Sequence, residues 1–397
     1  MTSGAKRNMR LSIVSAIGSI SQQEWNRIAE QDEYSPFLEY QFLHSLELAG
    51  CTAPDTGWYP NHFVLSNSDG LVGAAPAYVK TNSNGEFIFD QGIAARVIEA
   101  GLDYYPKLVA TLPFTPCPGY QFLTSGKADI EEQNSRIIEG MRDFTYQSTY
   151  SSASILFPSP CFDERLQAVE HLKPWSHQYY LWLNEGYETF DDYLHRFNKN
   201  QRRNIARERA SIRNQGISIR IHVSEEIDSY LMNLMFKFYH NTNQRFGPWG
   251  ALFLNEEWFC HIAEIWAHRI ILVAAYLPKY EAPIAMSMLI RKNQHLYGRY
   301  WGDMLYIPNL HFELCYYAPI EYAITQRISD FDPGMGSHHK ARRGFRSYCF
   351  NSFHDYTNRA VREYFGYLTG LCRKEELKLI EQLNNSVPWA RKRVKTV

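Results

Sequence analysis

The chain has 397 residues, of which 45% are hydrophobic, and its 41 Lys and Arg nearly balance its 42 Asp and Glu, giving a net charge of −1 at pH 7. The length suggests two domains with sizeable cores. The near-zero charge excludes a protein that binds nucleic acid over its whole surface, so any basic footprint must be local. The seven cysteines form no Cys-x-x-Cys pair, and no apolar run reaches the ~18–20 residues that span a bilayer. We therefore expect a reduced, cytoplasmic protein without a membrane span or a signal peptide.

The first half shows a helix pattern followed by strand patterns. Apolar residues recur at helical spacing over 37–50, and Gly50 suits a helix C-cap. Residues 62–92 then alternate apolar and β-branched runs with turn clusters at 66–70 and 81–86. This pattern predicts three strands joined by two turns.

The second half repeats this plan about 210 residues later. Two helix patterns precede residues 269–303, where turns at 279–281 and 292–294 separate three predicted strands. A further helix pattern that contains Pro319 follows, and then a short strand that ends in glycines. A repeat of this length indicates domain duplication rather than a solenoid. We predict a mixed α/β domain at 10–194, a second one at 217–372 that carries the site, and a C-terminal helix and basic tail at 373–397.

A basic segment, 195–216, connects the two predicted domains. Between 196 and 213 it holds seven Lys and Arg but one Glu, with a thin apolar stripe, and it ends at Gly216. This composition predicts a basic helix. It is either a solvated linker or an element that faces polyphosphate or RNA.

Four longer motifs resemble those of the FemAB-like family of predicted N-acyltransferases, in the GNAT superfamily. They are FDQGIA and YYPKLVATLPFTPCPG in the first half, and HFELCYYAPIEYAI and FDPGMGSHHKARRGF in the second. The resemblance covers about 36–356 and implies two tandem GNAT-like domains in a mixed-sheet α/β fold. It also implies transfer of an amino acid from aminoacyl-tRNA to an amine, as bacterial Fem-type relatives do with peptidoglycan precursors. For the basic helix, it implies nucleic-acid binding by Lys199, Arg202, Arg203 and Arg207.

The sequence departs from the family pattern at His338, which stands in place of a carboxylate. The glycine-rich loop with which many GNAT enzymes bind the CoA pyrophosphate is absent after both strand groups. We therefore favour aminoacyl-tRNA over acyl-CoA as the donor, and an amine-bearing small molecule or peptide as the acceptor, with no cofactor. Two alternatives stay open: acylation of an amine from acyl-CoA or a carrier thioester, and a non-catalytic protein that recognises cell-wall peptide or RNA.

The chemistry of amide formation selects candidate catalytic residues from 331–345. The amine must lose a proton, and the acyl oxygen must be stabilised as it becomes negative. Histidine suits proton transfer near neutral pH, so His339 is the expected base. Lys340 and Arg343 are expected to hold a phosphate or the developing negative charge. Alternatively, His339 is structural and the two cations form salt bridges with Asp330 or Asp332.

Other polar and aromatic residues near these motifs are expected to bind substrate. Strand alternation places Arg299 and Trp301 on one face of a strand and Tyr300 on the other. Glu313 lies at a predicted helix start, where it either lines the site or caps the helix. The expected substrate-binding residues are Tyr104, Lys107, Tyr300, Trp301, His311, Glu313, Tyr316, Asp332 and His338. No metal site is expected, because the histidines and cysteine in 338–354 fit no common zinc spacing.

Overall fold

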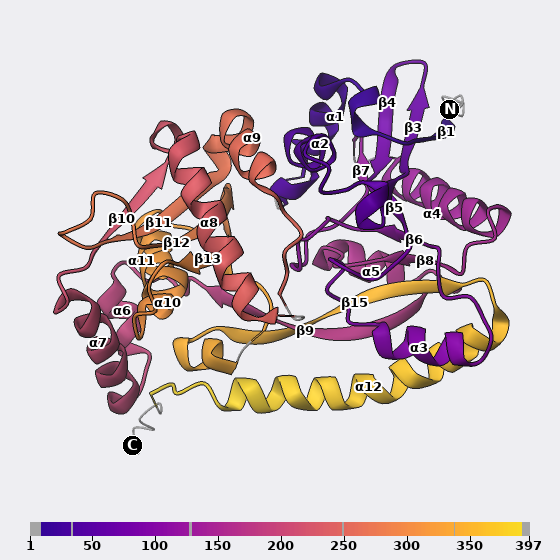
Figure 1. The fold of residues 1–397 in the computed structure, drawn as a ribbon. Helices are drawn as coiled ribbons and strands as arrows, with labels where there is room; N and C mark the ends of the chain where they lie inside the picture. The colour runs from indigo at the N-terminus through magenta and orange to yellow at the C-terminus, as the bar shows by residue number, and fades with distance from the viewer. Residues whose placement is uncertain (1–8, 33–34, 127–128, 248–249, 337, 391–397) are drawn as a thin grey trace, which may run out of the picture. The chain divides into compact units, whose positions relative to one another are not determined.

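The computed structural model describes residues 9–32, 35–126, 129–247, 250–336 and 338–390 (Figure 1). The chain forms two compact units, Met1–His177 with Phe350–Glu376, and Gln178–Cys349 with Leu377–Val397. These ranges differ from the consecutive ranges expected from the sequence, 10–194 and 217–372. The reason is that β9 (Lys173–Leu183) and β15 (Arg346–Tyr356) each belong partly to one unit and partly to the other. Of the expected C-terminal helix and basic tail, the part at 391–397 lies outside the described residues.

The first unit combines helices with two groups of strands. Its strands, besides its parts of β9 and β15, are β1 (Arg10–Val14), β2 (Trp58–Pro60), β3 (His62–Asn67), β4 (Gly70–Ala75), β5 (Ala77–Lys80), β6 (Lys107–Ala110), β7 (Leu123–Thr124) and β8 (Ser152–Ile155). Its helices are α1 (Gln22–Ala29), α2 (Tyr40–Leu48), α3 (Gln91–Glu99), α4 (Ile130–Gln147), α5 (Pro160–Gln167) and the first part of α12 (Arg359–Asn385). The strand orders are β1-β3-β4-β7 and β15-β8-β6-β5-β2, and β6 and β8 run parallel.

The second unit carries a sheet in the order β10-β11-β12-β13-β14-β9. Its strands are β10 (Ser218–Val223), β11 (Ile270–Tyr276), β12 (Ala285–Lys292), β13 (His295–Asp303) and β14 (Asp330–Asp332). Its helices are α6 (Phe190–His195), α7 (Lys199–Arg213), α8 (Ser229–Arg245), α9 (Glu256–Trp266), α10 (Leu310–Phe312) and α11 (Ala318–Thr325). A π-helical turn, Glu313–Tyr317, joins α10 to α11. Neighbouring strands are antiparallel except for β13 and β14, which are parallel.

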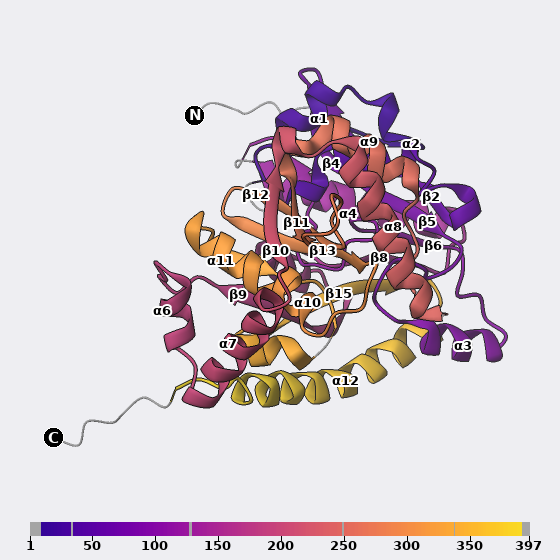
Figure 2. The same ribbon diagram turned by 60° about the vertical axis from the view of Figure 1, so that its left-hand side comes forward.

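Successive residues of β13 show which helices cover which face of this sheet. The Tyr300 ring packs on Tyr239 of α8 and Phe259 of α9. The next side chain, Trp301, points to the opposite face and contacts His311 of α10. Figure 2 shows α8 and α9 on one side of β11, β12 and β13, with α11 on the other. The core of the second unit therefore has one helical layer on each face of the sheet.

Several local predictions are confirmed. The helix pattern at 37–50 corresponds to α2, and Gly50 follows it with a φ of 67°. The basic segment forms α7, which Asn198 caps by accepting a hydrogen bond from the Gln201 N–H. The strand group at 269–303 forms β11, β12 and β13.

The predicted third strand of the first group, at 86–92, does not form. The chain there turns through two residues with positive φ, Phe87 and Phe89, and enters α3 at Asp90. Glu86 and Asp90 are buried and bond to the Lys107 ammonium instead of alternating between two faces of a strand. Within the described residues, no helix is both long and apolar enough to cross a membrane.

Candidate active site

The parallel pair β13 and β14 opens into a cavity of about 250 Å³. The two strands pair only from His295–Asp330 to Tyr297–Asp332. Beyond that point Gly298 lies against Pro333, where an added Cβ would come within 3.4 Å of the proline Cα. A glycine thus lets the two chains stay close at the base of the opening.

A β-bulge in β13 lies beside this opening. Met288 of β12 faces Tyr300, but the next residue, Leu289, faces Gly298, so that Arg299 is the extra residue of the bulge. Bulges re-aim side chains, and here Arg299, Tyr300 and Trp301 all line the cavity. The Tyr300 and Trp301 rings lie on opposite faces of the sheet, as expected, and both residues nevertheless belong to the cavity wall.

The cavity lining combines aromatic, sulfur-containing and cationic side chains. The described lining residues are Ser287, Met288, Leu289, Gly298, Arg299, Tyr300, Trp301, His311, Cys315, Tyr316, Pro333, Met335, Gly336 and Lys340. Four of the expected substrate-binding residues are thus brought together: Tyr300, Trp301, His311 and Tyr316. Cys315 and Met335 were not expected there, and only the π-helical turn and the glycine loop beside them bring them to the cavity.

Lys340 is buried and holds the glycine loop that forms one wall of the cavity. Its Nζ donates hydrogen bonds to the carbonyl oxygens of Gly334, Met335 and Gly336, each at 2.7 Å. The three protons of a lysine ammonium are therefore all donated to backbone oxygens. Burial lowers the pKa of Lys340 to about 8. The geometry assigns this side chain to loop positioning rather than to the free anion-binding role expected from the sequence.

Asp332 also holds the glycine loop in place. Its carboxylate accepts a hydrogen bond from the Gly334 N–H at 2.7 Å, and burial raises its pKa to about 6. Asp332 is absent from the cavity lining. This placement gives it a role in loop structure rather than the expected contact with substrate.

Arg343 is likewise buried and bonded within the protein. One terminal nitrogen donates to Glu208 of α7 at 2.9 Å, and the other donates to the His339 carbonyl oxygen at 3.0 Å. The guanidinium lies 3.5 Å from the centroid of the Phe312 ring. These contacts fix the 3₁₀ helix His338–Arg343 against α7 and α10. Among the described residues Arg343 forms its salt bridge with Glu208, and not with Asp330 or Asp332 as the alternative interpretation expected.

His311 is the histidine that reaches the cavity. Its ring packs against Trp301 at 5.1 Å and Tyr316 at 5.4 Å between centroids. Burial, with added effects of the Lys340 and Arg343 cations, lowers the pKa of His311 to about 4, so the imidazole is neutral at pH 7. Its Nδ1 is buried without a hydrogen-bond partner in the described structure. A buried nitrogen of this kind is suited to a hydrogen bond with a bound ligand.

His338 and His339 are exposed, and neither belongs to the cavity lining. The His339 ring lies 5.7 Å from that of Phe312. Glu313 is buried outside the cavity, where its carboxylate accepts hydrogen bonds from Arg209 of α7 at 2.9 and 3.1 Å. The structure therefore separates these three expected site residues from the cavity itself.

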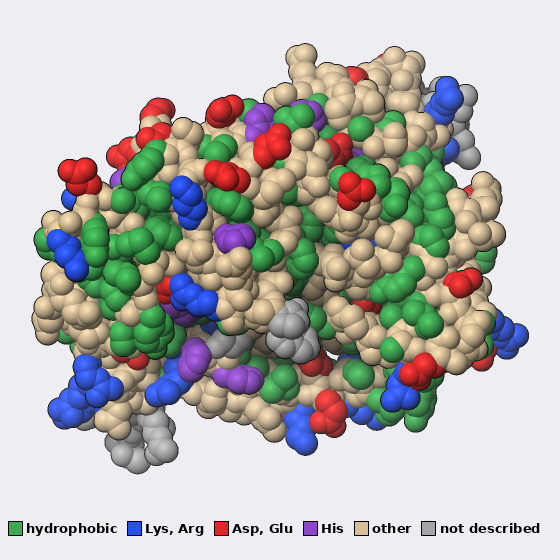
Figure 3. All heavy atoms as spheres, viewed as in Figure 1, with side chains coloured by type: hydrophobic (Ala, Val, Ile, Leu, Met, Phe, Trp, Pro, Cys, Tyr) green, Lys and Arg blue, Asp and Glu red, His purple; other side chains and the backbone are tan. Residues whose placement is uncertain are grey.

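Helix α7 divides its cations between two faces. Arg209 bonds to Glu313 and Glu321 on the protein side, and Arg202 donates to the Phe197 carbonyl oxygen. The exposed cations are Lys199, Arg203, Arg207 and Arg213, and the first three are spaced four residues apart. Figure 3 shows Lys and Arg side chains gathered where α7 lies in Figure 1. Three of the four expected nucleic-acid-binding residues thus form one exposed basic stripe.

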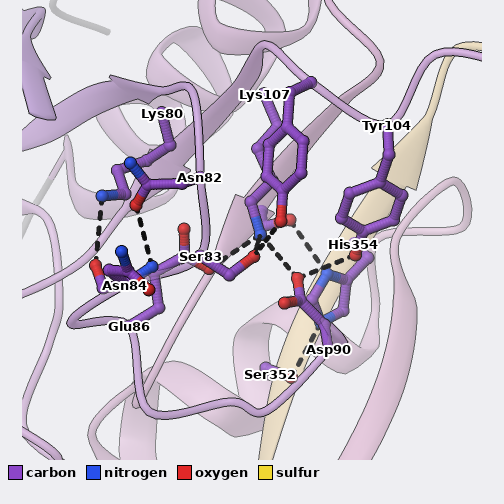
Figure 4. Close-up of polar contacts among 12 residues, drawn as sticks. Lys80, Asn82, Ser83, Asn84, Glu86, Asp90, Tyr104, Lys107, Ser352 and His354 are labelled. Carbon is purple, nitrogen blue, oxygen red and sulfur yellow. Dashed lines mark hydrogen bonds and ion pairs between the residues drawn. The ribbon is translucent and has the colours of Figure 1, made fainter. Parts of the chain in front are cut away.

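The first unit contains a separate buried network that includes Tyr104 and Lys107 (Figure 4). The Lys107 ammonium donates to Ser83 at 3.1 Å, Glu86 at 2.7 Å and Asp90 at 2.5 Å. The Tyr104 hydroxyl donates to Asp90 at 2.8 Å. The two ion pairs hold the Lys107 pKa above its ordinary value despite burial. Both expected substrate-binding residues are almost fully buried, so their visible role is to hold 83–90 against β6.

Lys80 lies opposite Lys107 in the β5–β6 pair and extends this network. Its ammonium lies 3.6 Å from the centroid of the Trp58 ring and donates to the Asn84 carbonyl oxygen at 3.2 Å. Burial lowers the pKa of Lys80 to about 7. Within the described residues, no group of His, Cys, Asp and Glu side chains is arranged to hold a metal ion.

Comparison with known proteins gives one family and one fold. The FemAB-like family model, described as peptidoglycan biosynthesis/recognition, matches residues 16–391. No curated protein matches the sequence. The crystal structure of FemX has a TM-score of 0.53 at 11% identity, over 89% of this chain and 100% of that chain. L-PGS from Bacillus licheniformis has a TM-score of 0.50 at 9% identity, over 88% of this chain and 96% of that chain.

A tandem GNAT protein from the clavulanic acid biosynthesis pathway has a TM-score of 0.43 at 9% identity, over 88% of this chain and 99% of that chain. At such identities a structural likeness shows the fold and not the function. The predicted mixed α/β fold is confirmed, and the chain shares its fold with FemX and L-PGS.

Proposed function

Because the chain belongs to the FemAB-like family and is an acyl- or aminoacyltransferase, we propose that it forms an amide by transferring an aminoacyl group from aminoacyl-tRNA to an amine acceptor. The observation that carries the proposal is the cavity between β13 and β14, because its wall combines aromatic residues and two cations with one buried imidazole nitrogen that has no partner in the described structure. The acyl group occupies this cavity, with its carbonyl oxygen facing His311 Nδ1.

His311 acts as a neutral hydrogen-bond donor in this proposal. A histidine whose pKa is about 4 is a weak proton acceptor at neutral pH, but its N–H can stabilise an oxygen that becomes negative. The cations of Arg299 and Lys340 add a positive field from the cavity wall, without a direct bond from Lys340 to the oxygen. As the amine attacks, a C–N bond forms and negative charge builds on the carbonyl oxygen. The carbonyl group re-forms when the ester C–O bond breaks, and the leaving ribose oxygen takes a proton from water to become a hydroxyl.

His339 is the proposed general base for the attacking amine. Amine attack requires the neutral form, and an exposed imidazole can take the proton and pass it to water. Its ring contacts Phe312, the neighbour of His311 in sequence, so it lies on the same side of the second unit as α10.

The basic stripe on α7 supports RNA as the carrier of the acyl group. Exposed cations in a regular row fit a phosphate backbone, which contributes affinity without sequence specificity. The family description, peptidoglycan biosynthesis/recognition, supports an amine acceptor of the peptidoglycan-peptide type.

The test is a donor assay in which purified protein is given a total aminoacyl-tRNA pool or a panel of acyl-CoAs, each with a mixture of amines. Mass spectrometry follows loss of donor and formation of amide. We expect charged tRNA to be consumed, and the consumption to be lost in His311→Ala. Consumption of acyl-CoA alone would replace the donor in this proposal, and failure with both donors would reject it.

A further inference from the structure

The walls of the β13–β14 cavity have a chemical bias that limits which acyl group fits. Two aromatic residues of the His311 side, Trp301 and Tyr316, line it together with Met288 and Met335. Tyr300 also belongs to the wall, although its ring packs on Tyr239 and Phe259. Aromatic and thioether groups contribute contact area to apolar and aromatic ligands. The cavity therefore favours an acyl group with an apolar or aromatic side chain.

The charged groups of the cavity have a single sign. Arg299 and Lys340 both belong to its wall. Among the described residues that form the wall, none is Asp or Glu. The nearby Asp332 carboxylate accepts the Gly334 N–H under the loop and is not part of the wall. A cationic side chain that enters the cavity would therefore lose water, meet two positive charges and gain no carboxylate.

Lys340 already donates its three protons to the loop carbonyl oxygens, so it offers no direct hydrogen bond to a bound side chain. The α-amino group of an aminoacyl ester does not face the same penalty as a lysyl ammonium. An α-amine titrates near ~8, so it can enter uncharged, whereas a lysine side chain titrates near ~10.4.

The volume of the cavity sets a limit on size. Apolar protein cavities of about 150 Å³ bind benzene, and this cavity measures about 250 Å³. One aromatic ring or a branched aliphatic side chain therefore fits, together with the acyl carbonyl group.

From these observations we propose that the cavity selects acyl groups with an uncharged apolar or aromatic side chain, of phenylalanyl or leucyl type, and rejects lysyl groups. This inference rests on the proposed function, since it assigns the side-chain class of the same acyl donor.

The test uses stable donor mimics whose acyl group is joined by an amide. One series carries Phe, Leu, Lys or Glu on 3′-amino-3′-deoxyadenosine, with the unacylated nucleoside as reference. A second series carries phenylpropanoyl, 4-methylpentanoyl, 6-aminohexanoyl or succinyl groups on aminopantetheine, which mimics a thioester donor. Isothermal titration gives the dissociation constants. We expect apolar and aromatic compounds to bind roughly 10- to 100-fold more tightly than the cationic lysyl and 6-aminohexanoyl compounds, the cost of an unpaired buried polar group.

A carboxylate placed in the wall should change this order. In Met335→Glu the 6-aminohexanoyl or lysyl compound should gain affinity and the aromatic one should lose it. Met304→Glu is the matched control, because Met304 is exposed and lies outside the cavity wall, and it should leave the order unchanged.

The outcomes separate this inference from the function on which it rests. An apolar preference in the adenosine series supports both the inference and the proposed function. The same preference in the pantetheine series alone supports the inference but replaces tRNA by a thioester as the donor. Binding of every adenosine compound with the affinity of the unacylated nucleoside would overturn the inference but retain the donor. Tightest binding of a charged compound would also overturn it, and absence of binding in both series would overturn the inference and the function together.

Discussion

His311 is the side chain on which the proposed chemistry depends most. It combines a place in the cavity wall with a buried nitrogen that has no partner in the described structure. We predict that His311→Ala lowers kcat on the order of 10²- to 10³-fold, the usual effect of removing one oxyanion donor, with little change in KM.

Steady-state kinetics with the accepted donor measures this effect, and His339→Ala provides the comparison. His339 is exposed, so its loss should remove the proposed base and lower kcat at pH 7 without affecting the fold. If His311→Ala kept full kcat, the assignment of the cavity to the acyl oxygen would be wrong.

Lys340 allows a sharp distinction between a positioning role and anion binding. In Lys340→Met three loop carbonyl oxygens lose their shared donor, and we expect the free energy of unfolding to fall by about 2–4 kcal/mol. Urea denaturation measures the change. Full stability combined with lost donor binding would contradict loop positioning and favour the anion-binding role.

At the scale of elements, helix α7 carries cations on two faces. Arg202 and Arg209 bond within the protein, and the basic stripe faces solvent. Replacing Lys199, Arg203 and Arg207 with Gln should weaken tRNA binding and reduce the slope of log affinity against log salt by about 2–3, because each lost phosphate contact removes roughly 0.7–0.9.

Filter binding at several salt concentrations measures this slope, and circular dichroism checks the fold. The control is Arg209→Gln, which removes one positive charge from the protein-facing side of α7 and should lower stability instead, since it leaves Glu313 buried without its partner. An unchanged salt slope in the triple variant would reject RNA contact by α7.

Elements with strong local patterns could be predicted from the sequence. Periodicity and caps identified α2, α7 and the strands β11 to β13. The sequence alone could not show that the strand expected at 86–92 does not form. The observed conformation depends on an ion pair between Glu86 and Lys107, which are distant in sequence, and no local pattern predicts such a pair. The bulge at Arg299 was missed for a related reason, since register depends on the partner strand.

The site could be predicted only in part. Trp301, His311 and Tyr316 were expected near substrate and do share a cavity wall. From the sequence, Lys340 and Arg343 were expected to be cations available to a ligand. In the fold both are buried and donate to backbone carbonyl oxygens, and the sequence shows neither the burial nor these acceptors. Met335 and Cys315 carried no sequence signal of a site, because a loop and a π-helical turn place them there.

At the scale of the whole molecule, buried neutral histidines couple stability to pH. His354 bonds to Ser154 at 2.9 Å and Ser352 at 2.8 Å, and burial lowers its pKa to about 3. An unfolded histidine titrates near ~6.5. Between about pH 6.5 and 3 the unfolded state therefore binds one more proton at this position than the folded state. The free energy of unfolding falls as the pH drops through that window.

The variant His354→Gln removes this proton uptake. We expect its free energy of unfolding to depend less steeply on pH between 6 and 4, by up to about 1.4 kcal/mol per pH unit. Urea denaturation followed by tryptophan fluorescence at several pH values measures the slope. The same slope in the variant and the parent would contradict a buried neutral His354.

The most direct test of the account is a crystal structure of the protein with the phenylalanyl amide of 3′-amino-3′-deoxyadenosine. We predict that the acyl side chain lies between β13 and β14 against Trp301 and Tyr316, with its carbonyl oxygen ~2.7–3.1 Å from His311 Nδ1. An acyl group bound elsewhere, for example in the cavity of about 200 Å³ in the first unit beside Gln121 and Asn134, would contradict the assignment of the active site to the second unit.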